Sequence, residues 1–82
     1  MKSVEGLITL TQEGRFELVT ERGRVMQFVL AQDASLEPQD LPTLRGGRRR
    51  IRVDYTEPNH IVGYLAHALS EADGNLGQGI QQ

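Results

Sequence analysis

The sequence predicts a small all-β protein, a barrel of five short strands with one helical turn after the third strand. Three observations favour this fold. Apolar and polar residues alternate with a period of two through three early segments, as they do in half-buried strands. Two polar four-residue breaks separate these segments, each with glycine in its third place, which is typical of hairpins. The chain has 82 residues and no cysteine, so we expect one domain and no disulfide framework.

The first three predicted strands share one parity. They span Val4–Thr11, Arg15–Thr20 and Val25–Leu30, with Arg15 counted in both the first break and the second strand, and the even-numbered residues are the expected core face. The expected inward residues of these strands are Val4, Gly6, Ile8, Leu10, Phe16, Leu18, Thr20, Met26, Phe28 and Leu30. In the breaks between strands, Gly14 and Gly23 are expected to take the positive φ that only glycine adopts cheaply.

The odd-numbered face of these strands is not uniformly polar. Four apolar residues lie on it, namely Leu7, Val19, Val25 and Val29. Either the sheet curls so that part of its outer face is covered, or these residues form an exposed patch that a partner covers. They are the predicted protein-interaction face.

The next segments predict a helical turn and a fourth strand. Leu36–Leu41 is the expected turn, because Pro38 suits the first helical position and Pro42 prevents the turn from running on. In the predicted strand Arg48–Tyr55, apolar residues alternate with arginines, which places the arginines on the outer face.

The segment from His60 to Leu69 fits two structures. As a strand it closes the barrel, which we favour because a short barrel needs an element to cover its open edges. As a helix capped by Asn59 it gives an α+β fold with a C-terminal helix over a four-stranded sheet. Within the strand alternative, a helical Ala66–Ala72 is still left open. The expected domain spans residues 1–73, and residues 74–82 form a Gly/Gln-rich, flexible tail.

Charge is distributed unevenly along a chain whose net charge is −2. Five of the nine basic residues lie in one window that contains no acidic residue. The rest of the chain holds the other four basic residues and all eleven acidic residues. The basic residues of the window are Arg45, Arg48, Arg49, Arg50 and Arg52. This arginine run either forms a solvated strand edge that pairs with acids elsewhere, contacts phosphates, or meets an acidic partner. The N-terminus lacks the apolar run of a signal peptide and no stretch could span a membrane, so we expect a cytoplasmic protein without membrane contact, or an excised domain.

Few residues suggest chemistry. His60 and His67 lack the spacing of a chelating pair, and Asp54, Glu57 and His60 cluster at a predicted turn without a nucleophile. We therefore expect no enzyme activity, no metal site and no cofactor.

The four aromatic residues are expected to belong mainly to the core, because the domain is small. Tyr64 is the best candidate for stacking on a base beside the arginines, since its facing depends on the last element.

The element order over Val4 to Leu69 resembles small five-stranded barrels of the OB-fold kind, and less closely SH3-like barrels. The patterns Gly14-Arg15-Phe16-x-Leu18 and Ile51-Arg52-Val53-Asp54-Tyr55 are similar to the S1-type and initiation-factor-type subgroup. Members of that subgroup bind single-stranded RNA with aromatics on strands two and three and a basic surface. The resemblance implies base-stacking roles for Phe16 and Phe28.

Two functional hypotheses follow. In the first, the protein is a non-enzymatic binding or assembly module that recognises a protein, or a second copy of itself, through Leu7, Val19, Val25 and Val29. In the second, it binds single-stranded RNA or DNA through the arginine run and Tyr64. The acidic net charge favours the first.

Overall fold

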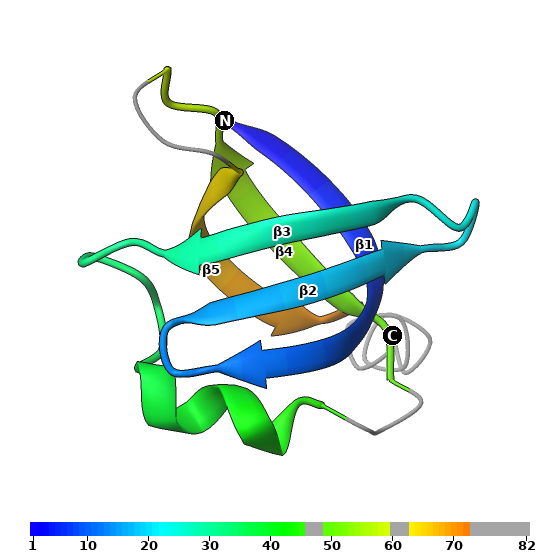
Figure 1. Ribbon diagram of the computed structural model, residues 1–82, viewed down its shortest axis with the longest axis horizontal. Coiled ribbons are helices and arrows are strands. Elements are labelled where there is room, and N and C mark those ends of the chain that lie inside the picture. The colour runs from blue at the N-terminus through cyan, green and yellow to red at the C-terminus, as the bar shows by residue number, and fades with distance from the viewer. Residues whose placement is uncertain (46–48, 60–62, 73–82) are drawn as a thin grey trace, which may run out of the picture.

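Five strands form a closed barrel in the computed structural model of the protein, which describes residues 1–45, 49–59 and 63–72 (Figure 1). The elements are β1 (Lys2–Gln12), β2 (Arg15–Thr20), β3 (Val25–Leu30), the 3₁₀ helix η1 (Pro38–Thr43), β4 (Ile51–Thr56) and β5 (Tyr64–Glu71). Around the barrel the strands follow the order β1-β2-β3-β5-β4, and every neighbouring pair is antiparallel except β3 and β5. The predicted all-β barrel, with its helical turn after the third strand, is confirmed.

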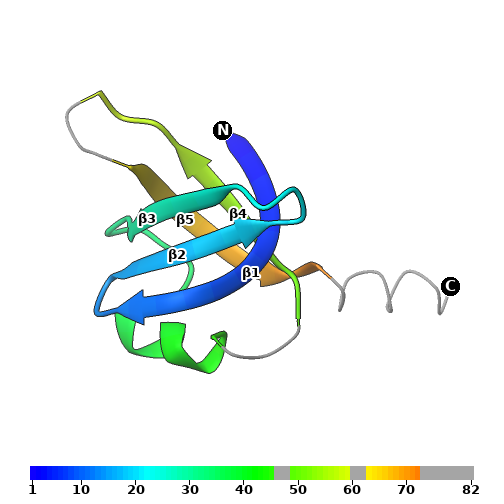
Figure 2. The same ribbon diagram turned by 45° about the vertical axis from the view of Figure 1, so that its right-hand side comes forward.

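The core is built from the inward faces of all five strands. Ile8, Phe16, Leu18, Met26 and Phe28 are buried, as their parity predicted. They are joined by buried residues of the later elements, Leu41, Ile51, Val53, Tyr55 and Ala66. Helix η1 lies across one end of the barrel, where Leu41 closes it (Figures 1 and 2).

Strand β1 bends and so pairs with two neighbouring strands. Its first half pairs with β4 and its second half with β2, and Gly6 is paired in both ladders (Figure 2). A Cβ on Gly6 would overlap the carbonyl group of Val19. Only glycine therefore allows the close approach of β2 at the bend.

A bulge in β1 reverses the parity of the strand. Ile8 is paired with Leu18 but Leu10 is paired with Glu17, so Thr9 is the extra residue. As a result Leu10 points outward and is 50% exposed. The prediction that Leu10 belongs to the core is wrong for this reason.

The two hairpin turns place their positive φ differently. Gly23 has φ 84°, as predicted. In the first turn Glu13, and not Gly14, takes the left-handed conformation, with φ 55°. The left-handed conformation is less favourable for Glu13 than it would be for glycine, because Glu13 has a Cβ.

Two expectations about later elements also needed correction. Helix η1 continues through Pro42 to Thr43, because Pro42 lacks only the amide donor while its carbonyl still accepts from Arg45 N. The last element is a strand throughout Tyr64–Glu71, since it pairs with both β3 and β4. The helical alternative for Ala66–Ala72 is therefore wrong over Ala66–Glu71, and the predicted tail lies outside the described residues.

Candidate binding surfaces on the barrel

Three residues of the predicted protein-interaction face form one row across β1, β2 and β3. Leu7 is paired with Val19, and Val19 with Val25, so the three side chains are lateral neighbours on the outer face. Leu7 is 39% and Val25 53% exposed, and Val19 is half-buried between them. We call Leu7, Val19 and Val25 the apolar row.

The fourth residue of that prediction, Val29, is separated from the apolar row by polar side chains. Glu17 lies between them and accepts two hydrogen bonds, one from Thr9 Oγ1 at 2.9 Å and one from Gln27 Nε2 at 2.9 Å. Val29 is instead paired with Arg15 and with Leu65. The four apolar residues therefore divide into a row at one end of β3 and a single valine at the other.

Two hollows lie at the Val29 end of the same face. The larger, of about 430 Å³, lies between the β1–β2 turn, the end of β3 and the start of η1. The smaller, of about 130 Å³, is lined by Leu10, Gln12 and Gln27 among others. Arg15 lines both, and we call the larger hollow the Arg15 groove. Sequence reasoning missed this site because the segment after β3 carries no recognisable motif, and the bulge that exposes Leu10 has no sequence signal.

The described members of the arginine run all make contacts within the fold. Arg50 forms ion pairs with Glu5 at 2.7 Å and with Glu21 at 3.1 Å, and Arg49 forms one with Glu71. These contacts fasten the start of β4 to its neighbours.

Arg52 and Arg45, at the two ends of the run, also make contacts within the fold. Arg52 Nε lies 3.4 Å from Asp54 Oδ1, and Arg45 Nε donates to the backbone oxygen of Thr9 at 3.3 Å. Arg48 lies outside the described residues. The reading in which the run pairs with acids elsewhere in the chain thus describes the contacts of Arg49, Arg50 and Arg52.

The carboxylate of Asp54 lies between two donors, Ser3 and Arg52. Ser3 Oγ donates a hydrogen bond to Asp54 Oδ1 at 2.6 Å, and the Arg52 guanidinium lies beside the same carboxylate. The hydrogen bond from Ser3 and, to a smaller extent, the charge and hydrogen bond of Arg52 lower the pKa of Asp54 below its ordinary value.

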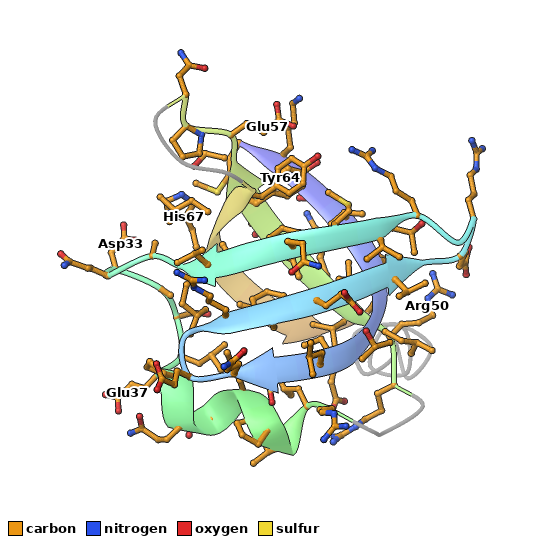
Figure 3. The ribbon with its side chains drawn as sticks, in the orientation of Figure 1. Asp33, Glu37, Arg50, Glu57, Tyr64 and His67 are labelled. Atoms are coloured by element: carbon orange, nitrogen blue, oxygen red, sulfur yellow. The ribbon has the colours of Figure 1, made fainter. Side chains whose placement is uncertain are left out.

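Tyr64 lies apart from Arg50 of the arginine run (Figure 3). It is half-buried at the start of β5, and Figure 3 shows it well away from Arg50. Its ring contacts those of Phe28 and Tyr55, and its hydroxyl oxygen accepts a hydrogen bond from Arg24 Nη2 at 2.8 Å. The structure thus brings Tyr64 together with Arg24 of the turn between β2 and β3, a residue that the predicted site did not include.

Phe16 and Phe28 are not available to stack on bases. Their exposed fractions are 2% and 1%, and the two rings stack on each other with centroids 4.9 Å apart. The role that the resemblance implied for them is therefore wrong for this chain, because both belong to the inward parity of β2 and β3.

His67 links β4, β5 and the segment after β3. It is the extra residue of a bulge in β5, since Tyr55 is paired with Ala66 but Asp54 with Ala68. Its Nε2 lies 2.9 Å from Thr56 Oγ1, and its Nδ1 lies 3.3 Å from Asp33 Oδ1 (Figure 3). The imidazole thereby ties the segment that follows β3 to the barrel wall.

Comparisons with protein-family models, curated proteins and solved structures found no match to this chain. The fold defines a small closed five-stranded β-barrel, which is compatible with both OB-like and SH3-like barrels. In the described part of the chain, no helix is long and apolar enough to cross a membrane. The same residues contain no group of three His, Asp or Glu side chains placed to hold a metal ion.

Proposed function

We propose that the protein is a non-enzymatic binding module that docks a partner protein on the outer face of β1, β2 and β3. The observation that carries this proposal is the apolar row, in which three apolar side chains are neighbours in register and two of them, Leu7 and Val25, are exposed. Exposed apolar patches with polar surroundings are typical of protein interaction sites. The hydrogen-bonded side chains of Thr9, Glu17 and Gln27 supply such a polar border.

The size of the row favours a partner protein over a second copy of this chain. An obligate homodimer buries about 1,000 Å² or more per subunit, largely with apolar side chains, which is a large share of a molecule whose accessible surface is 5671 Å². The apolar row supplies only three side chains toward that area. Such a patch suits the centre of a small interface with a partner that contributes apolar side chains of its own.

Site-specific photo-cross-linking in cells tests the docking face. A benzophenone amino acid placed at Val25 is expected to yield a discrete cross-linked partner, and the Leu7→Thr change is expected to abolish that product. The same probe at Ser70, an exposed residue of β5, is the matched control and should not yield it. Identical products from both positions would contradict the proposal, and so would a product that survives Leu7→Thr.

Measurement of the mass in solution decides the part played by self-association. A monomer at micromolar concentration is the expected result. A dimer that Val25→Thr dissociates would make a second copy the occupant of the face, in place of a different protein.

A second candidate function is binding of single-stranded nucleic acid. Its support is the strand order β1-β2-β3-β5-β4 with a helical turn between β3 and β4. This order resembles OB-fold barrels, whose β2–β3 face and adjacent loops bind oligonucleotides. The face here carries Arg15 but no exposed aromatic side chain on β2 or β3, and the described arginines of the run are engaged within the fold.

Fluorescence anisotropy of labelled single-stranded RNA and DNA, at low and moderate salt, tests this candidate. If the arginine run contacts phosphates, each Arg→Gln change at Arg45 or Arg52 should lower the salt slope by about 0.7. Absence of binding at low salt would remove nucleic acid from consideration.

A further inference from the structure

We propose that the Arg15 groove receives a lysine or arginine side chain of the docked protein and so selects which partners the face accepts. The inference rests on the proposed docking function and names the chemistry of the partner. The groove lies on the same outer face as the apolar row, at the opposite end of β3.

The walls of the groove are held in place by contacts within the fold. Leu30 N donates a hydrogen bond to the Gly14 carbonyl oxygen at 2.8 Å, which fixes the β1–β2 turn against β3. A Cβ on Gly14 would lie 3.8 Å from Pro38 Cγ, so the turn also approaches the start of η1. The cavity is therefore largely formed before any ligand arrives, as ligand sites usually are.

The apolar lining of the groove matches the stem of a long basic side chain. Val29, Leu30, Leu36 and Pro38 line it. Lysine and arginine bury their methylene stems along apolar surface while the charged group remains near water. A groove of about 430 Å³ has room for such a stem.

The charged lining of the groove favours a cation at its edge. Glu13 and Glu37 both line it, next in sequence to the neighbouring residues Gly14 and Pro38, and Figure 3 places Glu37 beside the start of η1. Glu13 forms no ion pair within the described residues, and Glu37 accepts a hydrogen bond from Gln39 Nε2 at 2.5 Å. Two carboxylates against the single guanidinium of Arg15 leave the lining with an excess of negative charge.

Arg15 opposes these carboxylates and therefore sets the strength of selection. The nearest carboxylate on its own strand, Glu17, is already engaged by Thr9 and Gln27. Arg15 forms no ion pair with any described residue, so its charge acts on whatever enters either hollow. Removal of this charge is expected to strengthen the binding of a basic side chain.

Titration of the ¹⁵N-labelled full-length protein with three short peptides tests the inference. The probes are acetyl-Ser-Leu-Ser-X-Ser-Leu-Ser-amide, in which X is lysine, norleucine or glutamate. We expect the lysine peptide to shift the amide signals of Gly14, Ala34 and Leu36 saturably at up to millimolar concentration. The norleucine peptide, which has the stem without the charge, should bind about two- to fivefold more weakly, as the loss of an exposed ion pair implies.

Three charge variants refine the test. Glu13→Gln and Glu37→Gln should each weaken the lysine peptide about twofold, and Arg15→Gln should strengthen it by a similar factor. Equal binding of lysine and norleucine peptides, stronger binding of the glutamate peptide, or no binding of any peptide would each overturn the inference.

The docking function and this inference fail in different ways. If Leu7→Thr leaves cross-linking from Val25 unchanged while the lysine peptide still binds and depends on Glu13, the docking proposal falls and the groove remains a site for basic side chains. If cross-linking depends on Leu7 but the peptides do not distinguish lysine from norleucine, docking stands and the groove plays no part in selection.

Discussion

Gly6 lies so close to Val19 that a Cβ at position 6 would overlap the Val19 carbonyl group. This contact occurs where β1 passes from its ladder with β4 to its ladder with β2. Because the obstructing atoms belong to the backbone, Gly6→Ala is expected to destabilise the fold by about 2 kcal/mol, within the usual range for overpacking.

Urea denaturation measures this cost, and Gly14→Ala is its control. A Cβ on Gly14 meets only Pro38 at 3.8 Å, an ordinary contact, so that variant should stay within about 0.5 kcal/mol of the parent. A Gly6→Ala variant as stable as Gly14→Ala would show that the two strands can separate at the bend without loss.

The bulge at Thr9 predicts that substitutions at Ile8 and at Leu10 have different effects on stability, although both residues have even numbers. Ile8→Thr should destabilise the protein by about 2 to 3 kcal/mol, because it puts a hydroxyl into a buried site. Leu10→Thr should change the stability by less than about 0.5 kcal/mol, since Leu10 is half exposed. Thermal or urea unfolding of both variants checks this, and a large loss for Leu10→Thr would argue against the bulge.

Glu13 is expected to respond to substitution through its backbone. Its φ of 55° is unfavourable for a residue with a Cβ. Glu13→Gly should therefore stabilise the fold by about 0.5 to 1 kcal/mol, the strain relief exceeding the added entropy of the unfolded chain. Glu13→Ala removes the carboxylate but keeps the strain, so it should bring no such gain in a denaturant titration.

Asp54 makes stability depend on pH in the acidic range. Its pKa is lower in the folded protein than its ordinary value, chiefly through the hydrogen bond from Ser3 and then through Arg52. The stabilisation it brings is complete above the ordinary pKa of an aspartate and is lost as the pH falls through the lowered pKa. Ser3→Ala should raise the pKa of Asp54 toward its ordinary value, which an NMR titration of its carboxyl carbon measures. An unchanged pKa would assign the effect to Arg52 instead.

Strand positions and facing were largely predictable from the sequence because period-two alternation survives wherever a ladder is regular. The parity of Phe16, Leu18, Met26 and Phe28 predicted their burial correctly. It failed at Leu10, where one extra residue reverses the faces, and a bulge leaves no mark in the pattern of residue types. The positive φ of Glu13 was likewise unpredictable, since Gly14 beside it is the intrinsically favoured residue.

The candidate sites were harder to predict because they depend on contacts between distant segments. The arginine run stands out in the sequence, but the ion pairs of Arg49 and Arg50, just before β4, reach Glu5, Glu21 and Glu71, which lie in three different parts of the chain. The apolar row required knowledge of strand register, which turn lengths only suggest. The Arg15 groove arises where the segment after β3 passes the β1–β2 turn, and no local pattern encodes that meeting.

The ladder between β3 and β5 has a consequence for the order in which the molecule forms. Among the described residues it is the shortest ladder, and it joins partners such as Phe28 and Tyr64 that are far apart in the sequence. The hairpins β1–β2 and β2–β3 join near neighbours, so their closure costs less chain entropy, and we expect it to precede that of the barrel. During synthesis the three strands that carry the apolar row are made before β5, the strand that pairs with β3 and β4 and closes the barrel.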